Sequence, residues 1–93
     1  MMKKIRKYLV DMVDKQIVNL PVGAEILTFQ TIDDDPYLWA MINPKEKRTE
    51  ERYIEMFGTE RPIDTGKNIN RKYLATFQLK MSKWVGHVFE KLD

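Results

Sequence analysis

The residues best suited to chemistry lie near the end of the sequence, in the segment RKYLATFQLKMSKWVGHVFE at residues 71–90. Its His87 is the only histidine, and histidine titrates near neutral pH when unperturbed, so it is the default candidate for a general base. A nucleophile and an orienting carboxylate would have to come from Ser82, a threonine or Glu90, without a diagnostic motif such as GxSxG around them. We interpret His87 as a structural residue beside a strand bend at Gly86, and we expect no enzyme activity.

The same segment sets basic residues beside aromatic ones, a pattern that can bind a polyanion. Between residues 66 and 83 there is no acidic residue. Lysines there would neutralise phosphates while Trp84 stacks on a base. KYLATF does not match the RNP1 signature of RNA-binding domains, and lysines also protect edge strands from self-association. The candidate binding residues are Lys67, Arg71, Lys72, Lys80, Lys83, Trp84 and His87.

Two further motifs favour turns over ligand sites. Asp33, Asp34 and Asp35 could bind a cation through their carboxylates, but the spacing of a calcium loop is absent and a hairpin turn explains them better. DTGKN at residues 64–68 has the GK pair of a phosphate loop without its upstream glycine or its following Ser or Thr. The chain has no cysteine and one histidine. We therefore expect no metal site and no cofactor.

Composition predicts a small soluble protein. The chain has 93 residues, of which 43% are hydrophobic and 32% charged, and this is typical of one ordinary domain spanning residues 1–93. The net charge is +2, divided as −1 over residues 1–46 and +3 over residues 47–93. No uncharged run is long enough to span a membrane, and the basic start MMKKIRK lacks the apolar region of a signal peptide. We expect a cytoplasmic protein, and dimerisation would be one remedy for its small core.

Turn residues recur about every ten positions and separate segments rich in β-branched and aromatic residues, which favours strands. We expect strands near residues 3–10, 16–20, 25–32, 37–42, 52–57, 71–80 and 84–90. The DDDP segment should join two of them as a hairpin, and YLWAMI, apolar on both faces, should be the central buried strand. Residues 49–57 have helix formers, but we favour a charged loop that leads into the strand RYIEMF.

Residues 72–80 alternate most clearly. Tyr73, Ala75, Phe77 and Leu79 should face the core, while Lys72, Thr76, Gln78 and Lys80 face solvent, with Leu74 as the one exception. The predicted fold is an all-β small barrel or two-layer sandwich of six to seven short, mainly antiparallel strands. Its predicted core consists of Ile5, Val18, Leu20, Ile26, Leu27, Phe29, Leu38, Ala40, Ile42, Ile54, Met56, Phe77, Leu79, Val85 and Phe89.

Several sequence blocks resemble a family of small uncharacterised proteins from tailed bacteriophages and prophages. The resemblance spans nearly the whole chain and is carried by LPVGAEILTFQ at 20–30, LWAMINP at 38–44, FGTERPI at 57–63 and the closing HVFE. It implies a phage origin and a β-rich domain, and it implies no activity or catalytic residue. The sequence departs from the family pattern around residues 65–70 and 80–83.

The absent catalytic constellation and the phage-like blocks favour a non-catalytic binding module that acts on a host factor in the infected bacterial cytoplasm. Counter-defence, either by blocking a host protein or by sequestering a small nucleotide signal, would be a specialised form of that function. The alternative is a domain that binds single-stranded nucleic acid through the surface formed by residues 66–84. A structural protein of the virion is a further alternative. We expect no membrane partner.

Overall fold

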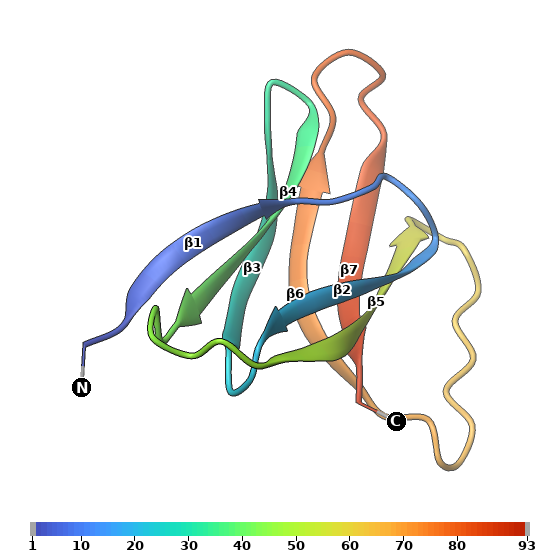
Figure 1. The fold of residues 1–93 in the computed structure, drawn as a ribbon. Coiled ribbons are helices and arrows are strands. Elements are labelled where there is room, and N and C mark those ends of the chain that lie inside the picture. Colours follow the sequence, from blue (N-terminus) through green and yellow to red (C-terminus); the bar gives the residue numbers. More distant parts are fainter. Residues whose placement is uncertain (1, 93) are drawn as a thin grey trace.

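Strands and turns make up the chain over residues 2–92, which are the residues that the computed structural model describes (Figure 1). The seven strands are β1 (Lys4–Leu9), β2 (Lys15–Pro21), β3 (Glu25–Ile32), β4 (Asp35–Ile42), β5 (Thr49–Gly58), β6 (Arg71–Gln78) and β7 (Val85–Lys91). The expected strand positions are confirmed to within a few residues. Residues 49–57 form no helix: they belong to β5, which starts at Thr49, three residues before the predicted strand.

The strands form two antiparallel sheets that pack as the two layers of a sandwich. One sheet has the order β1-β4-β3 and the other has the order β2-β5-β7-β6. The two layers meet where β3 lies beside β6, and there the rings of Phe29 and Phe77 are 5.2 Å apart. The strands do not close into a barrel, so the expected all-β sandwich is confirmed and the barrel alternative is wrong.

The hydrophobic core lies between the sheets and is centred on β4. Leu38, Ala40 and Ile42 of β4 are buried, as expected for the YLWAMI strand. Most of the predicted core is correct, but Ile5 and Leu27 are exposed instead. Val85 and Phe89 are half-buried on the outer face of β7, because β7 buries the alternate positions Gly86, Val88 and Glu90. Ile5 lies on β1, whose main contact is with β4, and the register of Leu27 is shifted by a β-bulge between Ile26 and Thr28. The buried set also includes Ala24, Phe57, Leu74 and Val88, which were not predicted.

A second bulge, in β6, makes part of the predicted alternation of that strand wrong. Tyr73 pairs with Phe89 and Ala75 pairs with Val88, so Leu74 is an extra residue in the ladder. Such an insertion exchanges the faces of all residues on one side of it. Tyr73 is accordingly 56% exposed while Leu74 is buried. The predicted alternation holds for Ala75 and Phe77, and it fails for Tyr73.

The DDDP segment forms the predicted β3–β4 hairpin. Asp33 and Asp34 are the two turn residues, and both have the positive φ angles (51° and 66°) that the tight turn requires. The Asp34 carboxylate accepts hydrogen bonds from the backbone N–H groups of Lys80 (2.7 Å) and Met81 (3.0 Å). The β3–β4 turn is therefore tied to the β6–β7 turn, which lies beside it in Figure 1.

Candidate functional site

The predicted basic residues do not gather into one patch. Lys67 lies in the loop before β6 and Lys72 lies at the start of that strand, whereas Lys80 and Lys83 lie in the β6–β7 turn at its other end (Figure 1). An eight-residue strand spans about 25 Å. The basic residues of the 66–84 segment are therefore distributed along the length of the molecule.

The guanidinium group of Arg71 is bound by neighbouring residues of the same chain. Its Nε donates to Glu55 Oε1 at 2.7 Å, another nitrogen donates to the Asp64 carbonyl, and the guanidinium lies 5.4 Å from the centre of the Phe57 ring. The Arg71 side chain is 14% exposed and that of Glu55 is 7% exposed. This buried pair fastens the 59–70 loop to the outer face of the second sheet, and it leaves Arg71 little charge to offer a ligand.

His87 lies on the outer face of β7, where its ring is hydrogen-bonded to side-chain hydroxyl groups. Its Nε2 is 2.7 Å from Thr59 Oγ1 and its Nδ1 is 2.9 Å from Thr76 Oγ1, which in turn is 2.7 Å from the Tyr73 hydroxyl. Thr59 and His87 have the contact of a nucleophile with its base, but a hydroxyl occupies the place of the orienting carboxylate. Thr76 cannot stabilise an imidazolium as an anion would, so the arrangement resembles a satisfied structural histidine.

Trp84 packs on a different side of the sheet from His87. Its ring covers Gly58 and Gly86, where a Cβ atom on Gly86 would come within 2.6 Å of it, and its edge meets Phe77 at 5.9 Å between ring centres. The Trp84 residue is 39% exposed. Trp84 therefore closes the end of the core.

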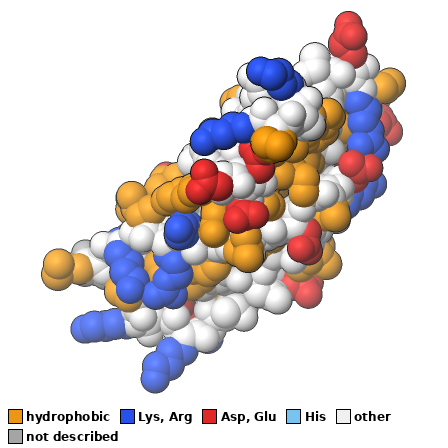
Figure 2. Space-filling model, turned by 90° about the horizontal axis from the view of Figure 1, so that it is seen from above, with side chains coloured by type: hydrophobic (Ala, Val, Ile, Leu, Met, Phe, Trp, Pro, Cys, Tyr) orange, Lys and Arg blue, Asp and Glu red, His pale blue; other side chains and the backbone are white. Residues whose placement is uncertain are grey.

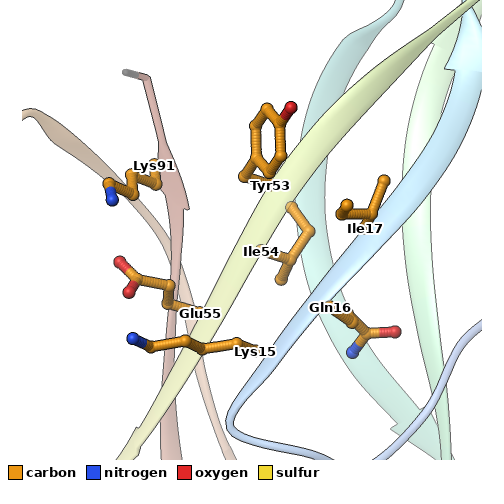
Figure 3. Close-up of a pocket in the computed structure, with 7 residues that line it drawn as sticks. All are labelled: Lys15, Gln16, Ile17, Tyr53, Ile54, Glu55 and Lys91. Atoms are coloured by element: carbon orange, nitrogen blue, oxygen red, sulfur yellow. The ribbon is translucent and has the colours of Figure 1, made fainter.

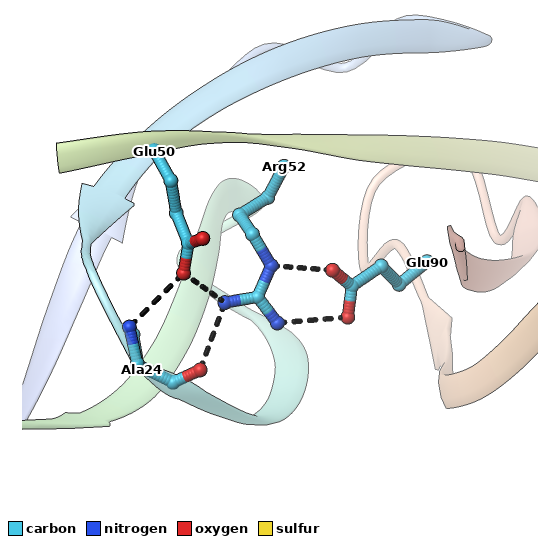
Figure 4. Close-up of polar contacts among 5 residues, drawn as sticks. Ala24, Glu50, Arg52 and Glu90 are labelled. Atoms are coloured by element: carbon cyan, nitrogen blue, oxygen red, sulfur yellow. Dashed lines mark hydrogen bonds and ion pairs between the residues drawn. The ribbon is translucent and has the colours of Figure 1, made fainter. Parts of the chain in front are cut away.

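The second buried ion pair links two neighbouring strands of the four-stranded sheet and also binds the β2–β3 turn. Arg52 on β5 binds both carboxylate oxygens of Glu90 on β7, and it also donates to the Ala24 carbonyl at 2.8 Å (Figure 4). Glu50 lies 3.8 Å from Arg52 and accepts the Gly23 N–H at 3.0 Å. The hydrogen bonds to Glu90 raise the pKa of Arg52 above its ordinary value. These contacts hold the β2–β3 turn against the four-stranded sheet.

A shallow depression of about 420 Å³ lies on the outer face of β2 and β5. Lys15, Ile17, Tyr53 and Lys91 line it, and the Tyr53 ring lies between Ile17 and Lys91 (Figure 3). The neighbouring carboxylate, Glu55, is neutralised by Arg71. The depression combines two lysines with an aromatic ring, but it is open to solvent and has no enclosing wall.

A row of four unpaired cations lies at residues 3–7, at the start of β1, which the sequence alone did not indicate as a binding surface. Lys3, Lys4, Arg6 and Lys7 are exposed, and within residues 2–92 none of them has an ion-pair partner. By contrast, Arg48, Arg52, Arg61, Arg71 and Lys80 are all paired with carboxylates. Figure 2 shows blue side chains gathered with few red ones at the lower left, the end where β1 lies.

Apolar side chains accompany Lys7 on the outer face of the three-stranded sheet, whereas Lys4 and Arg6 lie on its opposite face, in register with Ile42 and Ala40 of β4. Ile5 is 58% and Leu9 68% exposed. They lie opposite Met41 and Tyr37 of β4, with Trp39 between. We call residues 3–9 together with Tyr37, Trp39 and Met41 the β1 surface. A surface of free cations and exposed apolar side chains is suited to a partner that is acidic and partly apolar.

Residues 2–92 have neither a membrane-spanning helix nor a cluster of metal-binding side chains. Residues 2–92 contain no helix of the length and apolarity needed to cross a membrane. Nor do they bring three or more histidine, aspartate or glutamate side chains together in a cluster that could hold a metal ion.

The fold and the β1 surface define a small β-sandwich with an open, basic edge strand. The chain belongs to the family described as Domain of unknown function (DUF7352), which matches residues 1–93. No curated protein and no solved structure shows a significant match to the chain.

Proposed function

We propose that the protein is a non-catalytic binding module that holds an acidic protein on the β1 surface. The observation that carries this proposal is the row of four unpaired cations at residues 3–7 beside the exposed side chains of Ile5 and Leu9. Unpaired surface charge attracts and orients an oppositely charged partner, and exposed apolar groups gain free energy when the partner covers them.

The resemblance to phage and prophage proteins supports a host factor as that partner, in the cytoplasm of an infected bacterium. Counter-defence by blocking a host protein fits this proposal best, because the β1 surface is an extended, open face suited to a protein. Sequestration of a nucleotide signal would instead use the depression at Lys15, Tyr53 and Lys91.

Two triple variants with equal net charge test the proposal. One replaces Lys4, Arg6 and Lys7 by glutamine, and the other replaces Lys67, Lys72 and Lys83 by glutamine. After circular dichroism has shown that both are folded, each is used with the parent protein to capture partners from a bacterial lysate. Acidic proteins should be retained by the parent and by the second variant, and lost from the first. Equal retention by both variants would refute the proposal, as would turnover of a substrate that His87→Ala abolishes.

Single-stranded nucleic acid is the second candidate, favoured by the aromatic side chains of β4. The rings of Tyr37 and Trp39 are 6.5 Å apart beside the β1 cations, as in surfaces that stack bases. However, Lys7 Nζ already lies 4.7 Å from the centre of the Tyr37 ring, so a base would have to displace it. Fluorescence anisotropy with labelled oligonucleotides decides this candidate: binding that weakens as salt rises supports it, and no binding at low salt removes it.

A further inference from the structure

The outer edge of β1 has backbone groups that are free to pair. β1 is the edge strand of its sheet and is bonded on one side, to β4. The Val10 N–H donates to the Pro36 carbonyl at 3.1 Å, which fixes Val10 as a position that points toward β4. Because backbone direction alternates along an antiparallel strand, Lys4, Arg6 and Tyr8 also point toward β4. The N–H and C=O groups of Ile5, Lys7 and Leu9 therefore point to the open side.

The side chains of β1 determine which residues a strand paired with its open edge should carry. Lys4 and Arg6 lie on one face of the sheet, and Lys7 lies on the other face between Ile5 and Leu9. A guest strand would therefore carry acids opposite Lys4, Arg6 and Lys7, and apolar residues opposite Ile5 and Leu9. A second copy of β1 is a poor guest, because it would bring like charges together along the whole edge.

We propose that an extended acidic segment of a partner protein adds to β1 as a fourth, antiparallel strand of the sheet. This inference rests on the proposed function and specifies its recognition mode. Backbone hydrogen bonds to Ile5, Lys7 and Leu9 supply register, and the alternating cations and apolar side chains supply selectivity. Strand addition needs no pocket, so it suits a surface whose free groups are all along one exposed edge.

The geometry defines a capped probe peptide, Val-Thr-Glu-Glu-Val-Glu, whose first residue lies opposite Leu9 and whose last lies opposite Lys4. Its third residue faces Lys7 and directs its N–H toward β1, whereas its fourth residue faces Arg6 and directs its N–H to solvent. N-methylation of the third residue should weaken binding about tenfold or more, because it removes one inter-strand bond and adds a clash. N-methylation of the fourth residue should leave binding within about twofold.

Amide exchange measured by NMR on the full chain gives the second readout. In the free protein the amides of Ile5, Lys7 and Leu9 should exchange quickly, while those of Arg6 and Tyr8 are already protected by β4. Addition of the parent peptide should slow exchange at the first three residues. A peptide with lysine in place of each glutamate is the charge control, and it should not bind.

The outcomes separate this inference from the proposed function. Binding of the acidic peptide without discrimination between the two N-methyl positions, and without new protection at Ile5, Lys7 and Leu9, would overturn strand addition while leaving the β1 surface as a binding face. Failure of the peptide to bind, with lysate partners still lost from the β1 triple variant, would also overturn strand addition alone. If the peptide fails and that variant keeps every partner, both proposals fail. If an oligothymidylate protects these amides and the peptide does not, the occupant is a nucleic acid and the inference is wrong.

Discussion

At the scale of single residues, the charged side chains divide into those that hold the fold together and those that are free. Arg52 and Arg71 are mostly buried and each binds a buried glutamate, whereas the cations of β1 have no such partner. A buried charge that loses its counterion stays desolvated, and this makes the buried pairs sensitive to substitution. The free cations can be changed with little effect on stability, because water solvates them in the folded and unfolded chain alike.

The Glu90→Gln substitution tests the first of these roles. It removes the carboxylate that binds Arg52 through both oxygens, in a site where the Glu90 side chain is 6% exposed, and leaves Arg52 only the longer contact with Glu50 at 3.8 Å. We therefore expect a loss of about 3 kcal/mol in the free energy of unfolding. Urea denaturation measures this change. Glu46→Gln is the matched control, since the Glu46 partner Arg48 is 77% exposed and its removal should cost much less. Equal losses for the two variants would contradict the structural role of the buried pair.

Asp34 makes stability depend on pH. The hydrogen bonds from the Lys80 and Met81 backbone lower the pKa of Asp34 below its ordinary value. The unfolded chain therefore takes up a proton on this carboxylate at a higher pH than the folded chain does, and the stabilisation that Asp34 gives is lost as the pH falls below about 4. Asp34→Asn should have a smaller decline in stability between about pH 5 and 3 than the parent protein. Parallel declines, measured by urea denaturation at each pH, would show that the turn contact is not formed in solution.

At the scale of elements, the sequence predicts strand positions well and strand faces less well. Strands were predicted from turn residues and β-branched runs, which are local signals. The predicted faces are wrong at Leu27 and Tyr73 because Leu27 and Leu74 are the extra residues of two β-bulges. A bulge depends on the register of the neighbouring strand, which local sequence does not show. Ile5 was predicted to be buried because alternation does not show whether a strand has a second layer against it.

The contact of Gly86 with Trp84 and Phe77 tests how tightly the second sheet closes over the core. A Cβ atom at this position would lie 2.6 Å from the Trp84 ring and 2.8 Å from the Phe77 ring. Gly86→Ala should therefore lower the free energy of unfolding by about 2 kcal/mol through overpacking. Gly66→Ala is the control, because its nearest neighbour is the carboxylate of Asp64 at 3.2 Å, and it should be milder. Thermal unfolding of the two variants decides the point.

At the scale of the whole molecule, the charge of a segment in the sequence does not locate the free charge on the surface. Residues 47–93 carry the positive excess, but four arginines and Lys80 of that half are held in ion pairs. The half with a net charge of −1 contains β1, whose cations are free. Apart from Arg48 with Glu46, these ion pairs join residues that are far apart in the sequence, such as Arg52 with Glu90. A sum of charges over a segment therefore does not predict which cations are paired. His87 was selected as a candidate from its residue type alone. The hydrogen bonds that support a structural role come from Thr59 and Thr76, which are distant in the sequence and are brought to His87 by the fold.

A map of NMR chemical-shift changes on addition of the acidic peptide tests the central claim, that partners bind along β1, most directly. If partners bind along β1, the largest changes should fall on the amides of residues 4–9 and of Tyr37, Trp39 and Met41, with little change at Lys67, Lys80 or Lys83. Changes concentrated between residues 66 and 84, or around His87 and Thr59, with β1 unaffected, would contradict it.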